Sequence, residues 1–286
     1  MKSLAFVHRN DARGAVGDFS PVLSVFTHYE LGNTLSPFLL LDHIGPGRLL
    51  PSAQPRGVHE HPHRGFETVT LVFAGELEHR DSSGHGGLVG PGDVQWMTAA
   101  RGVVHRELFS PSFGQAGGAF EMLQLWVNLP AAHKMDPPRY QHLERARIPV
   151  VPLAGGAGEV RVIAGRHGDA SGPALTHTPM TVLDVHLAAG HGACFATAPG
   201  DTAAVYLRAG RLRIGDEVVE DQGLAVLSQR EAGIEVTALE DCRLLVLAGA
   251  RIDEPLNAHG PFVMNTHEEV LQAYEDFKAG RLAPGP

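Results

Sequence analysis

Two histidines close together in the first half of the chain have the spacing of metal ligands. His61 and His63 are separated by one residue, so on an extended segment both side chains point to the same side, about 6–7 Å apart along the chain. Pro62 between them disfavours a helix and favours an extended or edge strand. Two imidazoles placed in this way can reach one metal ion.

A second pair of the same spacing follows downstream. His105 and Glu107 also stand at positions i and i+2, and on a facing strand they would add one nitrogen and one oxygen. Three imidazoles and one carboxylate form a ligand set for a first-row transition metal, whereas a structural zinc site more often closes with cysteines. The sequence therefore predicts one mononuclear centre with the metal ligands His61, His63, His105 and Glu107.

The chain has 17 histidines, so chance pairs are common and the other histidines need a separate interpretation. His59 has the same parity as His61 and His63 and is a further candidate, although it belongs to the preceding loop. We interpret the remaining ones in the first half and its connection as solvated or structural: His79, His85, His133 and His142.

Composition predicts an all-β protein that positions these side chains on strands. The 34 glycines and 20 prolines indicate many turns, and 286 residues are more than one compact core usually needs, so two domains are expected. In the first half we expect strands at 66–73, 77–81, 94–98 and 123–129, with a hairpin at Ala74-Gly75-Glu76. In the second half we expect strands at 160–164, 181–187, 203–207, 225–227 and 244–247.

The domain boundaries follow from a change of pattern after residue 130, where charged residues mix with prolines. We expect an N-terminal metal-binding domain at 1–132, a linker at 133–152 and a C-terminal domain at 153–286. Near the end, Thr266 and Glu269 form a capping box that starts a short helix, which we expect to stop at Gly280. One face of this helix is apolar and carries Val270, Ala273, Tyr274 and Phe277.

The two halves also resemble each other. Residues 69–77 resemble 204–212, and 91–95 line up with 221–225, which predicts a duplicated barrel. The same offsets place Ala196 and Ala198 opposite the first histidine pair, and Glu235 and Thr237 opposite the second pair. We therefore expect the second domain to lack the metal ligands.

Charge and composition argue against several classes of protein. The net charge of −9 argues against non-specific nucleic-acid binding, which depends on Lys and Arg. The chain has no run of the ~20 apolar residues that a membrane span needs, and its N-terminus has no cleavage-site pattern. Cys194 and Cys242 are too few for a disulfide framework and are expected to be ordinary thiols. A cytoplasmic location is the resulting expectation.

Several segments together resemble the pirin family of the cupin superfamily. They are HPHRGFETV at 61–69, GPGDVQWMTA at 90–99, RGVVHRE at 101–107 and HGPFVMNT at 259–266, with 38–43 and 123–129 in agreement. The resemblance implies a bicupin, in which two antiparallel jelly-roll-like β-barrels follow one another. It also implies one iron site per chain at the positions of His61, His63, His105 and Glu107, with metal in the N-terminal barrel only.

The activity that the resemblance implies is that of a metal-dependent dioxygenase that opens flavonols such as quercetin, a quercetin 2,3-dioxygenase. Its partners would be a small aromatic substrate and O2, and its cofactor one divalent metal, Fe(II) in the first place, with Mn, Ni, Co, Cu or Zn as alternatives. The metal would act as a Lewis acid on the 3-hydroxyl, and Glu107 would be the catalytic base. Candidates for an apolar pocket wall are Phe66, Phe73, Trp96 and Met97.

Two other functions stay open. The first is an iron-containing, redox-sensitive regulatory protein that binds a transcription factor or a metabolic enzyme, since oxidation to Fe(III) would add one charge at the barrel mouth. The second is a non-oxidative cupin such as a sugar epimerase. That type of site usually relies on a metal-free His/Tyr pair, and no tyrosine lies between Glu30 and Arg139.

Overall fold

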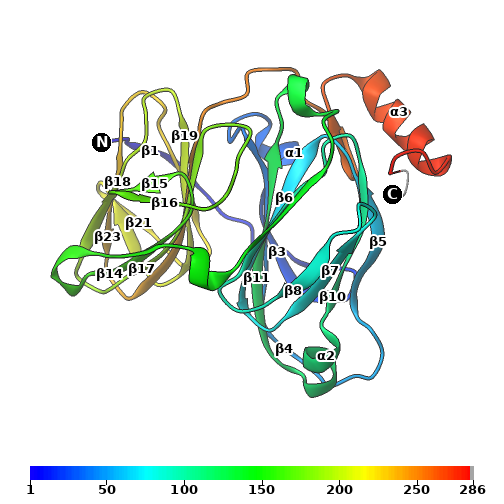
Figure 1. The fold of residues 1–286 in the computed structure, drawn as a ribbon. Helices are drawn as coiled ribbons and strands as arrows, with labels where there is room; N and C mark the ends of the chain where they lie inside the picture. The colour runs from blue at the N-terminus through cyan, green and yellow to red at the C-terminus, as the bar shows by residue number, and fades with distance from the viewer. Residues whose placement is uncertain (284–286) are drawn as a thin grey trace. The chain divides into compact units, whose positions relative to one another are not determined.

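The computed structural model describes residues 1–283, and nearly all of its regular structure is β-strand (Figure 1). The residues form two compact units built from interleaved segments. Unit 1 comprises 1–10, 28–37 and 146–251, and unit 2 comprises 11–27, 38–145 and the described residues from 252 onward. Each unit thus combines segments that are distant in sequence. The domain boundaries expected near residues 132 and 153 stay a prediction.

Unit 2 consists of antiparallel sheets of seven, four and two strands. The strand orders are β12-β9-β6-β11-β4-β3-β2, β5-β10-β7-β8 and β25-β26. The strands are β2 (Arg13–Val16), β3 (Phe19–Thr27), β4 (Phe38–Leu49), β5 (Gly57–His63), β6 (Phe66–Ala74), β7 (Leu77–Asp81), β8 (Gly86–Val89), β9 (Val94–Thr98), β10 (Val103–Phe109), β11 (Gly118–Asn128), β12 (Arg139–Leu143), β25 (Asn257–His259) and β26 (Phe262–Met264). The helices are α2 (Pro111–Ala116), α3 (His267–Lys278) and the 3-10 turn η1 (Ala131–His133).

Unit 1 has sheets of the same sizes. The strand orders are β1-β22-β19-β24-β17-β14-β13, β18-β23-β20-β21 and β15-β16. The strands are β1 (Leu4–His8), β13 (Val150–Pro152), β14 (Gly158–Ala164), β15 (Arg166–His167), β16 (Ala170–Ser171), β17 (Met180–Leu187), β18 (Gly192–Phe195), β19 (Thr202–Ala209), β20 (Leu212–Ile214), β21 (Glu217–Val219), β22 (Leu224–Leu227), β23 (Ile234–Ala238) and β24 (Cys242–Gly249). The helices are α1 (His28–Leu31) and η3 (Ala154–Gly156), and η2 (Arg145–Arg147) stands at the boundary of the two units.

The duplication predicted from the sequence is confirmed by topology. In each unit the seven-stranded sheet has the same order, so that β9, β6, β11 and β4 correspond to β22, β19, β24 and β17. The four-stranded sheets match in the same way, with β5-β10 corresponding to β18-β23. All nine predicted strands lie on strands of the structure, because alternating apolar residues mark the buried side of a sheet.

One local prediction was wrong. The strands before and after Gly75 exist, but β6 and β7 belong to different sheets, so this glycine carries the chain from one sheet to the other instead of closing a hairpin. Its φ of +83° is open to glycine, and a Cβ there would meet the ring of Phe120 at 2.6 Å. The expected linker also contributes a strand, because Arg139–Leu143 forms β12 and pairs along β9.

The C-terminal helix agrees with its sequence signals. Thr266 accepts a hydrogen bond from the backbone of Glu269, and the reciprocal half of the capping box is present. Val270 and Ala273 are buried as expected, whereas Phe277 is 40% exposed. Among residues 1–283, none of the helices combines the length and the apolar character that a membrane crossing requires.

Candidate metal centre

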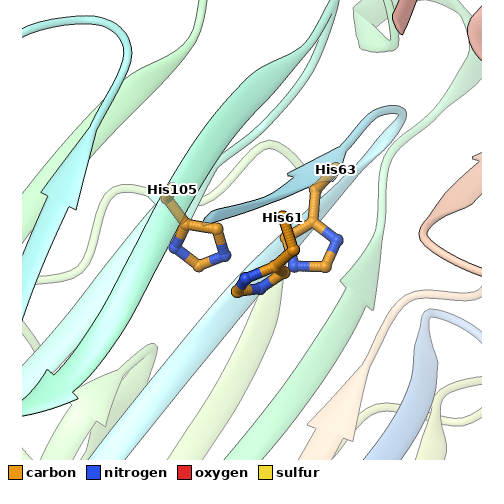
Figure 2. Close-up of side chains that lie close together, drawn as sticks. All are labelled: His61, His63 and His105. Carbon is orange, nitrogen blue, oxygen red and sulfur yellow. The ribbon is translucent and has the colours of Figure 1, made fainter. Parts of the chain in front are cut away.

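Three of the predicted ligands converge in the barrel of unit 2. Strands β5 and β10 are antiparallel neighbours, with His61 opposite His105 and His63 opposite Val103. The ring of His61 lies 4.2 Å from that of His105 and 4.8 Å from that of His63, between ring centroids. Figure 2 shows the three imidazoles turned toward one another, and their ligand atoms all lie within 4.8 Å of each other.

The nitrogens of these rings have the chemistry of metal donors. His63 Nδ1 and His105 Nε2 are buried and have no hydrogen-bond partner within residues 1–283. His61 Nδ1 lies 2.8 Å from the carbonyl oxygen of His59, which leaves Nε2 as the nitrogen that can bind a metal. Buried polar atoms without a partner are unfavourable, so two such nitrogens beside the half-buried His61 fit a divalent transition metal.

Electrostatics keeps the two inner imidazoles neutral, which is the form that binds metal. Burial, together with the neighbouring His61, lowers the pKa of His63 well below its ordinary value, although a hydrogen bond to the backbone of Pro261 acts to raise this pKa. Burial and the neighbouring histidines also lower the pKa of His105 far below its ordinary value. Neutral rings present a lone pair to a metal without first releasing a proton.

Glu107, the fourth predicted ligand, lies beside His105 but outside the three-histidine group. Its carboxylate forms a second group with His79 and His105, whose ligand atoms lie within 4.8 Å of one another. Gln95 Nε2 donates to Glu107 Oε1 at 3.3 Å, and Gln124 Nε2 donates to Oε2 at 3.0 Å. The Thr70 hydroxyl lies 3.1 Å from Oε1 and 2.6 Å from Gln124 Oε1, so its one proton serves either acceptor. These contacts fix the orientation of the Glu107 carboxylate beside His105.

The residues that hold Glu107 belong to a polar row across the seven-stranded sheet. Residues directly opposite one another on β9, β6, β11, β4 and β3 are Gln95, Thr70, Gln124, Asp42 and Ser24. Cross-strand neighbours face the same side of a sheet, so the whole row faces the barrel interior. Burial raises the pKa of Asp42 to about 6, against a hydrogen bond from Ser24. On one side of this row the interior is filled by Phe19, Val22, Ile44, Val72, Phe120 and Met122.

Aromatic side chains adjoin the histidines. His63 lies 5.0 Å from Phe66 and 5.4 Å from Trp126, between ring centroids, and Trp126 is half-buried. Of the predicted wall residues, Phe66 and Met97 share the inward face of Thr70, whereas Phe73 and Trp96 lie on the opposite face. Sequence reasoning missed Trp126, although it is two residues from Gln124 on a predicted strand and therefore shares its face.

Two further residues beside the site were missed. His79, interpreted as solvated or structural, is fully buried and lies 5.2 Å from His105, between ring centroids. Tyr140 stacks on His79 at 4.9 Å, and it comes from β12, in the expected linker. A tyrosine therefore does stand next to a site histidine, while the side chain of His59 is exposed.

The C-terminal segment holds the strand that carries the first histidine pair. Arg64 donates its backbone N–H to Pro261 and accepts from the N–H of Val263 at 3.0 Å. Lys134 Nζ donates to the carbonyl oxygens of Gly65 at 2.7 Å and Val263 at 2.9 Å, and to the side chain of Asn128 at 2.6 Å. Burial lowers the pKa of Lys134 to about 7.

The corresponding strands of unit 1 face their barrel with apolar residues. The inward residues of β18 and β23 belong to one buried cluster and are Ala193, Phe195, Ile234, Val236 and Ala238. Ala196 and Ala198, which the sequence offsets selected, follow β18 and are exposed, as is Glu235. The offsets were therefore out of register, because they place the inward His105 on an outward residue.

Comparisons with known proteins identify the family of this chain. The family model described as Pirin matches residues 20–127, and the model described as Pirin C-terminal cupin domain matches 182–283. A Pseudomonas aeruginosa protein named "putative quercetin 2,3-dioxygenase" is 52% identical over 99% of both chains. Human Pirin is 39% identical, covering 87% of this chain and 83% of its own.

A solved structure gives the same result for the fold. The crystal structure of quercetin 2,3-dioxygenase from Acinetobacter baumannii superposes with a TM-score of 0.96 at 44% identity, covering 99% of this chain and 98% of that one. The expected bicupin fold is thereby confirmed, and the chain belongs to the pirin family.

Proposed function

We propose that this protein is a metal-dependent dioxygenase that opens flavonols such as quercetin, with one divalent metal, Fe(II), at its N-terminal site. The observation that carries the proposal is the convergence of three histidines, two of which have buried nitrogens without a partner, beside a half-buried tryptophan. The similarity to a protein named as a quercetin 2,3-dioxygenase supports the choice of reaction.

Each residue of the site has a role in this proposal. His61, His63 and His105 hold the metal, and Glu107 completes the ligand set from its neighbouring position. When bound, the metal supplies Lewis acidity at the substrate oxygen and a coordination position for dioxygen. Glu107 takes the proton of the flavonol 3-hydroxyl, since its carboxylate is a proton acceptor inside the barrel.

The surrounding side chains orient the reacting groups. Gln95 and Gln124 fix the Glu107 carboxylate from two sides, so it meets the hydroxyl in one orientation. The half-buried Trp126 offers its ring to a flat aromatic substrate, and such a contact contributes about 0.5–1.5 kcal/mol beyond area burial. Phe66 is fully buried and packs against Trp126, with ring centroids 4.4 Å apart. The apolar filling beyond the polar row closes one end of the barrel to water.

Elemental analysis of protein purified without added metal, coupled to oxygen uptake with a panel of flavonols, tests the proposal. We expect one metal per chain and uptake that is lost in His105→Ala. Metal without uptake on any flavonol would remove the enzymatic function and favour the regulatory one, in which the oxidation state of the metal changes the charge at the barrel mouth. Absence of metal at this site would remove both.

A further inference from the structure

Behind His105, a buried chain of side chains leads away from the proposed metal. His105 Nδ1 lies 3.4 Å from His79 Nδ1, and His79 Nε2 lies 3.3 Å from Asp81 Oδ2. The side chains of His79 and Asp81 are 1% and 2% exposed. Asp81 stands directly opposite His105 on the paired strands β7 and β10, so the three residues come from one small piece of sheet.

The proton positions in this chain follow from the two ends. At one end a carboxylate can only accept, so His79 carries its proton on Nε2 and donates to Asp81. His79 Nδ1 is then an acceptor, and His105 must carry its proton on Nδ1 to donate to it. His105 Nε2, the buried nitrogen without a partner, is thereby left with a free lone pair.

Both residues behind His105 are themselves held in place. Asp81 Oδ1 accepts the backbone N–H groups of Ser83 at 2.8 Å and His85 at 3.1 Å, which fixes Oδ2 toward His79. The ring of Tyr140 stacks on His79 with an angle of 16° between the planes, and this limits rotation of the imidazole. The orientation of the pair therefore does not depend on a bound metal.

We propose that His79 and Asp81 are positioning residues that hold His105 in the tautomer whose Nε2 lone pair faces the metal, and so set the affinity of the site. The inference rests on the proposed metal site. Partners that orient a metal-bound histidine typically change metal affinity by about 10–100-fold when they are lost.

The geometry also offers His79 a different role, because its ligand atom lies within 4.8 Å of those of His105 and Glu107. The two roles differ in what Asp81 does. If His79 is a positioning residue, loss of the Asp81 acceptor weakens metal binding. If His79 is a direct ligand, replacing its imidazole removes a ligand while Asp81 is still in place. The hydrogen bonds at both nitrogens of His79 favour the positioning role.

Asp81→Asn is the sharpest variant. Because Oδ1 is occupied by two backbone N–H groups, the new amide keeps its oxygen there and turns its NH2 toward His79 Nε2. His79 must then carry its proton on Nδ1, where it meets the proton on His105 Nδ1. The chain reverses or breaks, and His105 is driven to the tautomer with a proton on Nε2.

Asp93→Asn is the matched control. Asp93 likewise accepts two backbone N–H groups, from Gly90 at 3.0 Å and Arg145 at 2.8 Å, and lies 3.6 Å from His142. His142 belongs to neither ligand group of unit 2, so this variant reproduces the loss of a turn-capping carboxylate beside a histidine without touching the chain behind His105.

The experiment measures metal affinity by chelator competition for wild type, Asp81→Asn, His79→Phe and Asp93→Asn, with circular dichroism to check the fold. Nitrogen-15 spectra of the metal-free wild type report the histidine tautomers independently of metal and of folding of the variants. We expect ~10–100-fold weaker binding in the first two variants and no change in the control. The spectra should show protons on His105 Nδ1 and His79 Nε2.

Two results would overturn the inference. Wild-type affinity in Asp81→Asn would overturn it alone, and so would spectra with the proton on His105 Nε2. Loss of metal in His79→Phe with full affinity in Asp81→Asn would make His79 a direct ligand. Absence of metal in the wild type, or normal loading in His105→Ala, would instead refute the proposed metal site itself.

Discussion

Replacing Gly65 with alanine should separate the metal-binding strand from the C-terminal segment. Gly65 has φ +88°, and an added Cβ would lie 1.9 Å from the carbonyl oxygen of Val263 and 2.8 Å from Met264 Sδ. A carbonyl oxygen cannot yield as the end of a flexible side chain does, so the backbone has to move. Gly84 is the matched control, since it has φ +84° in the same unit and no atom within 4 Å of the added Cβ.

The magnitude follows from the contacts that meet at this point. Both variants force alanine into a left-handed conformation, which costs about 1–2 kcal/mol. In Gly65→Ala, the hydrogen bonds of Arg64 with Pro261 and Val263 and those of Lys134 also separate. Two or three of these, at about 1 kcal/mol each, bring the total to roughly 3–5 kcal/mol, against about 1–2 kcal/mol for Gly84→Ala.

Urea unfolding followed by tryptophan fluorescence measures this difference in the right unit, because both tryptophans, Trp96 and Trp126, lie in unit 2. Metal affinity should also fall in Gly65→Ala, since His63 is two residues away and hydrogen-bonds the backbone of Pro261. Equal destabilisation of the two variants, or unchanged metal affinity in Gly65→Ala, would refute the idea that the C-terminal segment holds the site.

Three other outcomes are expected. His63→Ala should lose metal by mass spectrometry while its far-UV circular dichroism is retained, because β-pairing and burial hold the barrel; normal loading would remove His63 from the site. Glu107→Gln should keep part of its metal but lose oxygen uptake with quercetin by ~10²–10⁴-fold at matched loading, since an amide is no base near neutral pH; equal turnover would exclude Glu107 as the base. Burial raises the pKa of Glu67 from 4.5 to about 7, so its contribution to stability is full below pH 4.5 and is lost as pH rises through 7. The free energy of unfolding of Glu67→Gln, measured in urea, should therefore rise by about 3 kcal/mol relative to that of wild type as the pH increases from 5 to 8. Parallel pH profiles of the two proteins would contradict this.

The features predicted from sequence are those that a few neighbouring residues determine. The spacing of His61 and His63 places both on one side of a strand whatever its partner is. The capping box of Thr266 and Glu269 and the alternation of 123–129 are equally local, and each agrees with the structure.

The features that were missed depend on which strands become neighbours. His79 reaches His105 only because β7 pairs with β10 in one register, and Tyr140 reaches His79 only because β12 pairs along β9. A shift of one residue in either pairing would turn these side chains to the opposite face. The offset used for the second barrel was out of register for the same reason. A weak repeat in the sequence indicates the order of the strands, but not which residues lie opposite one another.

Anomalous diffraction from crystals of the protein purified without added metal tests the central claim most directly. Data on both sides of the absorption edge of the element found by mass spectrometry locate that element alone. We predict one peak per chain, among His61, His63 and His105 and within reach of Glu107. A peak elsewhere, a second peak in the C-terminal barrel, or no peak at the three histidines would contradict the account.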